Sequence, residues 1–337
     1  MMKHARRIKH LTIDGLNCEA FKPTKSEHMD FPLLETFDLG ENLDNRIAKK
    51  FKAALEKAPK PANVIMHEFA EHDQYQPSGT KTPLPLPYHQ LESLVIGEMT
   101  EQVHLMNHLS SALHLKKLIV KQCDPWRGLR VDPFAISNLE SFSFDSRGHP
   151  LRCSGMFASL TFPSLKSFQF SSWVVGRDSV FGGVAGEWPC QSFLSFLQRS
   201  TQLDCFTLRV PKLQLLSGEG LTRLLEAAPN LRKVVLVLKD DDDSHSFHAS
   251  LASSLAISPG STILVPHLAR LSVSFREPIT MPDQNIVQQS IESRAEERLE
   301  ELGRKRNVSP LKVKFKYNDK MPIPNERRVG RMGELLR

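Results

Sequence analysis

The chain has 337 residues, 40% of them hydrophobic and 24% charged, which is a globular composition and excludes a chain that is disordered throughout. The formal net charge is +6, but residues 303–337 carry eleven Lys or Arg against three acidic residues, so this end holds +8 and the remainder −2. This distribution excludes a nucleic-acid-binding surface spread over the whole protein, and we expect no nucleic-acid partner for the body of the chain.

Five cysteines are scattered along the chain and form no C-x-x-C pair. An odd number of isolated thiols favours a reducing compartment, so we expect a cytoplasmic or nuclear protein. The basic start, Met1 to Arg7, is not followed by the apolar segment of a signal peptide, and no run of 18 apolar residues occurs. The sequence therefore predicts no signal peptide, no membrane-spanning helix and no membrane partner.

The most informative feature is a recurring phrase of the form L-x-x-L-x-L, often preceded by an aromatic or small residue and a proline. Copies begin 24 residues apart at Leu91, Leu115 and Leu139, and a period in the twenties with this phrase is the signature of leucine-rich repeats. The last two apolar residues of the copies are, in chain order, Phe37 and Leu39, Leu94 and Ile96, Leu118 and Val120, Phe142 and Phe144, Phe168 and Phe170, Phe206 and Leu208, Val234 and Leu236, and Leu271 and Val273.

These paired apolar residues are two positions apart, which predicts strands with one face in a core. Between the phrases the apolar spacing becomes helical, as in Val103–Leu113 and Leu221–Ala228. Weaker phrases predict further strands at Ile8–Ile13, around Val64 and Met66, and at Leu311–Tyr317. Each unit is thus a strand, a turn, a helix and a return, and it buries its apolar face only by stacking on its neighbours.

We therefore predict an α/β fold, a leucine-rich-repeat solenoid (horseshoe) with a parallel concave sheet and convex helices, over residues 1–317. Residues 284–317 are expected to form a C-terminal cap, made of a helix and a lysine-rich edge strand, and residues 318–337 a basic disordered tail. Asn42 and Cys123 occupy the turn position at which the longer consensus has Asn or Cys; the other units depart from it, so the repeats are expected to be irregular. The first strand lacks a preceding helix, so we expect its open end to be covered by a partner or an upstream segment.

The phrases FPSLKSFQF, FLSFLQRSTQLDCFTL and LTRLLEAAPNLRKVVL, with the late SIESR helix and a final short strand, resemble the leucine-rich arms of fungal F-box proteins, most closely the basidiomycete group. The resemblance covers about residues 8–317. It implies a non-catalytic arm that holds the substrate of a cullin-type ubiquitin ligase, with an N-terminal F-box docked on the ligase adaptor. Nothing before Ile8 could form an F-box, so an F-box adaptor is expected as a partner only if a fuller product carries that module.

Candidate chemical sites are weak. His67, Glu68 and His72 have the spacing H-E-x-x-x-H, one residue too long for a zinc protease helix. His104 and His108 are four apart but have no evident third ligand, and the run Asp240–Asp243 lacks the glycine and distal glutamate of a calcium loop. The glycines of 182–186 lack the Lys-Ser/Thr pair of a phosphate loop. We therefore expect a protein that is not an enzyme, with no catalytic residue, no cofactor and no metal.

Strand residues that alternate with the apolar ones are expected to form a concave protein-binding face. The predicted binding residues are Lys117, Ile119, Lys121, Ser143, Gln169, Thr207, Arg209, Lys233, Val235, Arg270 and Ser272. The basic residues among them are expected to form one column on this face, which favours an acidic or phosphorylated protein segment as the ligand. Two alternatives remain open: a stand-alone scaffold or inhibitor unconnected with ubiquitin, and a nucleic-acid or nuclear-import role for the basic tail.

Overall fold

The computed structural model describes residues 7–13, 31–39, 58, 63–69, 86–99, 109–123, 133–146, 150–172, 188–210, 218–238, 265, 267–275 and 312–317. The strands of the main sheet are β1 (His10–Ile13), β2 (Thr36–Leu39), β3 (Asn63–Phe69), β4 (Ser93–Met99), β5 (Lys117–Cys123), β7 (Ser141–Ser146), β9 (Ser167–Ser172), β10 (Cys205–Val210), β11 (Lys233–Leu238), β12 (Arg270–Phe275) and β13 (Lys312–Tyr317). The other elements are β6 (Phe134–Ala135), β8 (Leu160–Thr161), the 3-10 helices η2 (Tyr88–Gln90) and η3 (Pro150–Cys153), and the helices α3 (Ser154–Ser159), α4 (Gln191–Arg199) and α5 (Gly218–Ala227).

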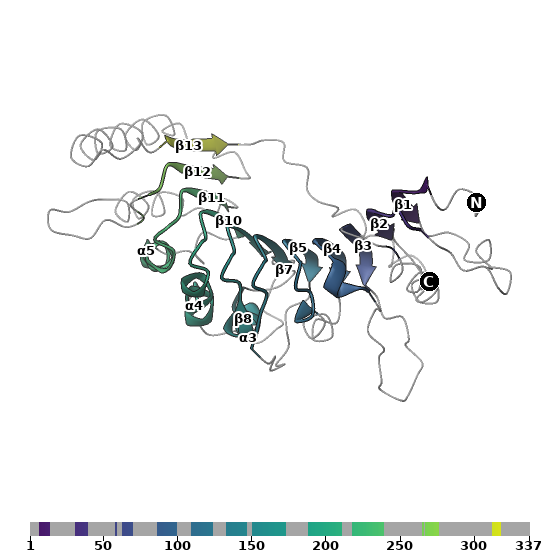
Figure 1. Cartoon of the computed structure of the whole chain (residues 1–337). Coiled ribbons are helices and arrows are strands. Elements are labelled where there is room, and N and C mark those ends of the chain that lie inside the picture. The colour runs from purple at the N-terminus through teal and green to yellow at the C-terminus, as the bar shows by residue number, and fades with distance from the viewer. Residues whose placement is uncertain are drawn as a thin grey trace, which may run out of the picture.

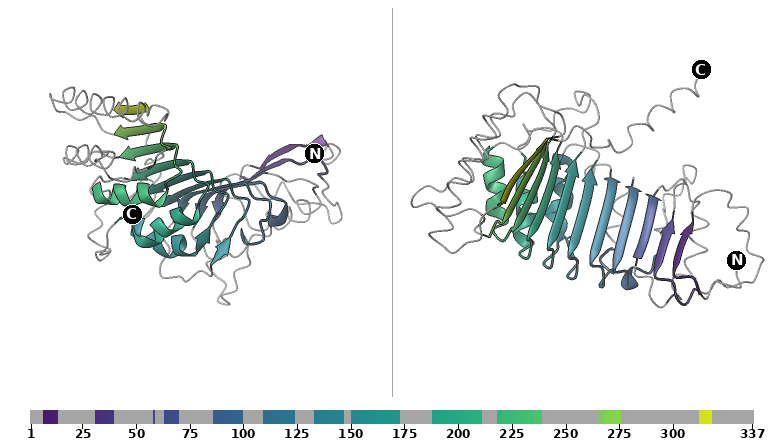
Figure 2. Two further views of the ribbon diagram at one scale, coloured as in Figure 1. Left: turned by 60° about the vertical axis from the view of Figure 1, so that its left-hand side comes forward. Right: turned by 90° about the horizontal axis from the view of Figure 1, so that it is seen from above.

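One eleven-stranded sheet runs through the described part of the chain, and its strands are neighbours in chain order from β1 to β13. Every described pair in it is parallel, from β1 with β2 to β12 with β13. Figure 1 shows the strands along an arc with β1 and β13 at its ends, and Figure 2 shows them side by side in the view from above. The predicted α/β class with a parallel sheet is confirmed.

The described α-helices lie on one side of the sheet, the outer side of the arc (Figure 1). The core lies between them and the strands, because buried residues of α4 and α5 belong to the same apolar cluster as those of the strands. The register aligns the apolar phrases, so that Phe142 pairs with Phe168 and Phe168 with Phe206. Two apolar positions of each phrase thereby form continuous lines across the sheet, and burial of these side chains is the main favourable contribution to folding.

The central strands carry an aromatic core. The Phe168 ring stacks on Phe142 with centroids 5.5 Å apart, lies 5.7 Å from Phe206 and meets Phe196 of α4 edge-on at 5.1 Å. Such offset and edge-on contacts add about 0.5–1.5 kcal/mol each to the burial of the rings. Arg199, at the end of α4, donates from Nη2 to the carbonyls of Phe157 and Leu160 at 2.7 and 2.8 Å, which joins α4 to the C-terminal end of α3.

A ladder of backbone hydrogen bonds fixes the start of most strands of the sheet. The carbonyl of Glu92 accepts bonds from the amides of Lys116 and Lys117, at 2.8 and 3.0 Å, and the carbonyl of Lys116 does the same for the next pair. The side chains alternate in charge along this line, with ion pairs Lys9–Glu35, Glu92–Lys116 and Glu140–Lys166 at 3.0, 3.1 and 3.1 Å. These exposed pairs follow the register of the backbone and add little to its stability.

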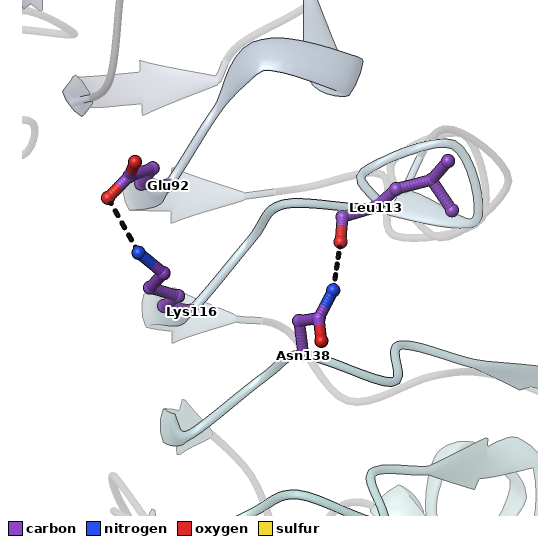
Figure 3. Close-up of polar contacts among 4 residues, drawn as sticks. All are labelled: Glu92, Leu113, Lys116 and Asn138. Carbon is purple, nitrogen blue, oxygen red and sulfur yellow. Dashed lines mark hydrogen bonds and ion pairs between the residues drawn. The ribbon is translucent and has the colours of Figure 1, made fainter.

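Two asparagines connect the turns of neighbouring units. Asn138 Nδ2 donates to the carbonyl of Leu113 at 2.7 Å, as Figure 3 shows beside the Glu92–Lys116 pair, and Asn230 Nδ2 donates to the carbonyl of Thr201 at 2.9 Å. Each asparagine lies just before the first leucine of its phrase. These contacts satisfy turn carbonyls from the next unit, at a position different from the Asn or Cys position that the sequence had indicated.

Several local expectations are wrong. Cys123 is not a turn residue, because it belongs to β5 and pairs with Met99 and Ser146. Leu113 is not on a buried helical face: it lies in the turn that follows Leu109 and is 66% exposed. The short strands β6 and β8, which pair in a separate sheet, and helix α3 had no clear sequence signal.

Several predictions lie outside the described residues. Among these are the capping helix before β13, the basic tail 318–337, and the segments that contain Asn42, the Asp240–Asp243 run and the glycines of 182–186. Strand β13 itself is present as the last strand of the sheet, as the lysine-alternating phrase predicted.

Candidate functional site

The strand residues that alternate with the core form the side of the sheet opposite the helices, here named the helix-distal face. The register arranges them in rows that cross the strands. The first row is His10, Thr36, Asn63, Ser93, Lys117, Ser141, Ser167, Cys205, Lys233, Arg270 and Lys312. The second row is Thr12, Asp38, Ile65, Val95, Ile119, Ser143, Gln169, Thr207, Val235, Ser272 and Lys314. A shorter third row is Asp145, Ser171, Arg209, Val237, Ser274 and Lys316.

The structure places the predicted binding residues together on this face. The register brings ten of them into the three rows, namely Lys117, Ile119, Ser143, Gln169, Thr207, Arg209, Lys233, Val235, Arg270 and Ser272. Lys121 is exposed and alternates onto the same face of β5, at the point where the register with β7 shifts. An array of this kind offers a ligand many separate side-chain contacts.

The basic residues do not form the single column that the sequence indicated. Lys117 lies on β5, whereas Lys233 and Arg270 are paired neighbours on β11 and β12. In the first row the neutral residues Ser141, Ser167 and Cys205 separate the two groups. Because adjacent strands are about 4.8 Å apart, Lys117 and Lys233 are about 19 Å apart along the row. The residues of the first two rows on the intervening strands β7, β9 and β10 are uncharged, so the register separates the basic residues.

The third row is largely enclosed. Ser171, Val237 and Ser274 are only 2, 8 and 8% exposed, although they alternate onto the helix-distal face. Arg209 is half-buried in this row, and its Nε has no accessible surface and no hydrogen-bond partner in the described part of the chain. The surface available to a macromolecular ligand is therefore the first two rows, and Arg209 contributes less of it than its sequence position suggests.

The helix-distal face also carries an aliphatic group that was not predicted from the sequence as a binding site. Ile65, Val95 and Ile119 are successive partners in the second row and are half-buried outside the apolar core. Only Ile119 was among the predicted binding residues. The alternation Asn63, Ile65, His67 contains the signal for Ile65, but β3 reads as a degenerate unit in which the apolar pair Val64 and Met66 dominates.

The described residues contain no evident metal-binding centre. No group of three or more His, Cys, Asp or Glu side chains with metal-binding geometry occurs among them. His67 and Glu68 lie in strand β3, while His72, His104 and His108 lie outside the described residues.

The described thiols are free: Cys153 is buried, and Cys190 and Cys205 are partly exposed. Burial raises the pKa of the Cys153 thiol to about 12, which keeps it protonated and unreactive at neutral pH. Cys205 lies in the first row between Ser167 and Lys233.

None of the helices in the described ranges is long and apolar enough to cross a bilayer.

Comparison with known proteins adds a structural likeness to this description. No protein-family model matches the sequence. No curated protein is significantly similar to it. Among solved structures, the crystal structure of a protein from Bacteroides fragilis is similar to this chain at 14% identity, with a TM-score of 0.47, over 91% of this chain and 70% of that one.

Proposed function

We propose that this chain is a leucine-rich-repeat solenoid that binds a protein segment on its helix-distal face, in the manner of the substrate-recognition arm of an F-box protein. The observation that carries the proposal is the continuous succession of parallel strand pairs from β1 to β13, in chain order along an arc (Figure 1). Solenoids of stacked units use such extended inner surfaces for binding.

The composition of the helix-distal face supports a protein ligand. Its first two rows combine exposed cations at Lys117, Lys233 and Arg270 with half-buried aliphatic groups at Val95 and Ile119. Apolar contacts give affinity, while charge complementarity raises the association rate and restricts the choice of partner. A surface of this composition fits an acidic or phosphorylated protein segment better than it fits a small molecule, which binds in an enclosed cavity.

The test is a matched pair of charge neutralisations in the full chain. The site variant carries Lys117→Gln, Lys233→Gln and Arg270→Gln; the control carries Lys9→Gln, Lys116→Gln and Lys166→Gln, which remove the same charge from the strand-start edge. Proteins captured on the wild-type chain are quantified by mass spectrometry, with the melting temperature of each variant measured in parallel. We expect the site variant to lose at least tenfold in capture at an unchanged melting temperature, and equal capture by the two variants would end the proposal.

The link to ubiquitin has a separate test. If the gene product carries an F-box upstream of residue 1, the small adaptor of cullin-type ligases should co-purify with that product but not with residues 1–337 alone. Absence of the adaptor from the full product would favour the stand-alone scaffold or inhibitor.

For the nucleic-acid alternative, deletion of residues 321–337 should abolish retention on an RNA column, and unchanged retention would exclude the tail as the cause.

A further inference from the structure

The helix-distal face is divided into zones of different chemistry along the direction that crosses the strands. At one end lies the aliphatic triad, Ile65, Val95 and Ile119, on β3 to β5. At the other lies the basic pair, Lys233 and Arg270, which are register partners on β11 and β12 and are both exposed. Beyond the basic pair the rows continue into β13 at Lys312 and Lys314. Exposed Lys117 and Lys121 also flank Ile119 on β5, and half-buried Val235 lies on β11. Within the described rows, however, three adjacent aliphatic residues occur at the first zone and two adjacent exposed cations at the second.

The strands between these zones carry small or neutral residues in both accessible rows. The first row has Ser141, Ser167 and Cys205 there, and the second has Ser143, Gln169 and Thr207. These six side chains are all half-buried. They bear no charge that would repel or attract a ligand backbone, so this zone suits a connecting segment of weak sequence preference.

Strand spacing sets the distance between the end zones. Ile119 and Lys233 are four strand steps apart, on β5 and β11, which corresponds to about 19 Å. Val95 and Arg270 are six steps apart, which corresponds to about 29 Å. An extended chain advances by about 3.3 Å per residue, so a peptide lying across the strands needs roughly six to nine residues to reach from one zone to the other.

We propose that this face recognises a bipartite linear peptide: an aliphatic or aromatic cluster and an acidic or phosphorylated cluster, separated by about six to nine residues of extended chain. The inference rests on the proposed protein-binding function and adds to it the composition and spacing of the ligand. Neither zone alone gives a tight site, because exposed ion pairs are each worth at most about 1 kcal/mol and the triad is a small patch. Covalent connection of the two ligand clusters makes the second contact intramolecular, which raises the affinity above that of either part.

The experiment selects peptides on the immobilised full chain from a phage library of random 16-residue sequences. We expect enriched sequences to carry both clusters at the stated separation. The best peptide is then synthesised with a fluorophore and its affinity measured by anisotropy. Shortening the connection to three residues, about 10 Å of extended chain, should weaken binding at least tenfold, because both zones cannot then be occupied together.

Matched protein variants assign each cluster to its zone. Lys233→Gln with Arg270→Gln should weaken binding at least tenfold and abolish its dependence on salt, whereas the control Lys116→Gln with Lys166→Gln should change it less than twofold. Val95→Ser with Ile119→Ser, which give these positions the character of the neutral zone, should remove the preference for the apolar cluster. Circular dichroism of each variant verifies that it is folded.

Enriched peptides without one of the clusters, affinity independent of the separation, or no enrichment over a blank surface would each overturn the bipartite ligand. Peptides that lack the pattern but lose affinity with the Lys117, Lys233 and Arg270 variant would overturn this inference and leave the proposed protein-binding function intact. Peptides insensitive to every change on the helix-distal face would overturn both.

Discussion

The two faces of the same sheet differ in how far one strand resembles the next. On the core face the two central positions of every described phrase are apolar, and ring contacts such as Phe142 with Phe168 cross between strands. On the helix-distal face the partners change from Ile119 to Ser143 and from Cys205 to Lys233 within one strand step. Close packing between strands and helices constrains the first face, whereas the residues of the second face are freer to vary.

The largest expected effect on stability comes from a substitution at the aromatic centre of the core face. Phe168→Ala removes a fully buried ring that touches Phe142, Phe196 and Phe206. We expect a loss of about 3–5 kcal/mol in the free energy of unfolding, from lost burial and the cavity that remains. Urea denaturation followed by circular dichroism measures it, and a loss below 1 kcal/mol would show that the ring is not packed as described.

A sharper version of the comparison uses two adjacent valines of β11. Val234 is fully buried in the core, and Val235 is half-buried on the helix-distal face. We expect Val234→Ala to cost about 2 kcal/mol, from roughly 0.8 kcal/mol per methylene plus a cavity term, and Val235→Ala to cost less than about 0.5 kcal/mol. Equal losses in the same denaturation assay would mean that the assignment of the two faces is wrong.

The pH dependence of stability tests the burial of Cys153 at the end of η3. The pKa of this thiol rises from the ordinary value of 9.0 to about 12 because burial disfavours the thiolate. Between these values the folded state binds more protons than the unfolded state, so stability should fall as pH rises through this window. Burial also raises the pKa of Tyr88, so this group likewise lowers stability as the pH rises.

We therefore expect the wild type to lose about 1–2 kcal/mol more than Cys153→Ala when the pH is raised from about 8 to about 10.5, by denaturant titration at each pH. The variant corrects for the other groups that titrate in this range. Parallel losses in the two proteins would show that the thiol is accessible to solvent.

The smallest expected effect concerns the charged edge where the strands begin. Lys166 lies 3.1 Å from Glu140, and both side chains are about half exposed. We expect Lys166→Gln to cost only about 0.2–1 kcal/mol, because solvent screens the pair, and to leave the register unchanged. A melting-temperature shift beyond a few degrees would assign this edge a larger role than its exposure supports.

Much of the fold follows from the sequence because the strand signal is local. The phrases L-x-x-L-x-L place their apolar residues two apart, so they predict both the strands and the core residues, including Leu94, Phe142 and Val234. The same alternation assigns the intervening residues to the helix-distal face. The short segments before β7 and β9 carry no such periodicity, so β6, β8 and α3 could not be derived from it.

The sequence by itself thus determined the order of the strands, the parallel sheet and the face on which each side chain lies. Only the tertiary structure decided which of those side chains are neighbours: that Lys117 is four strands from Lys233, that Ile65, Val95 and Ile119 adjoin, and that Val237 is enclosed. The physical reason is that alternation along one strand is a local property of its backbone. Spacing across strands and enclosure depend on register and packing between segments distant in the chain.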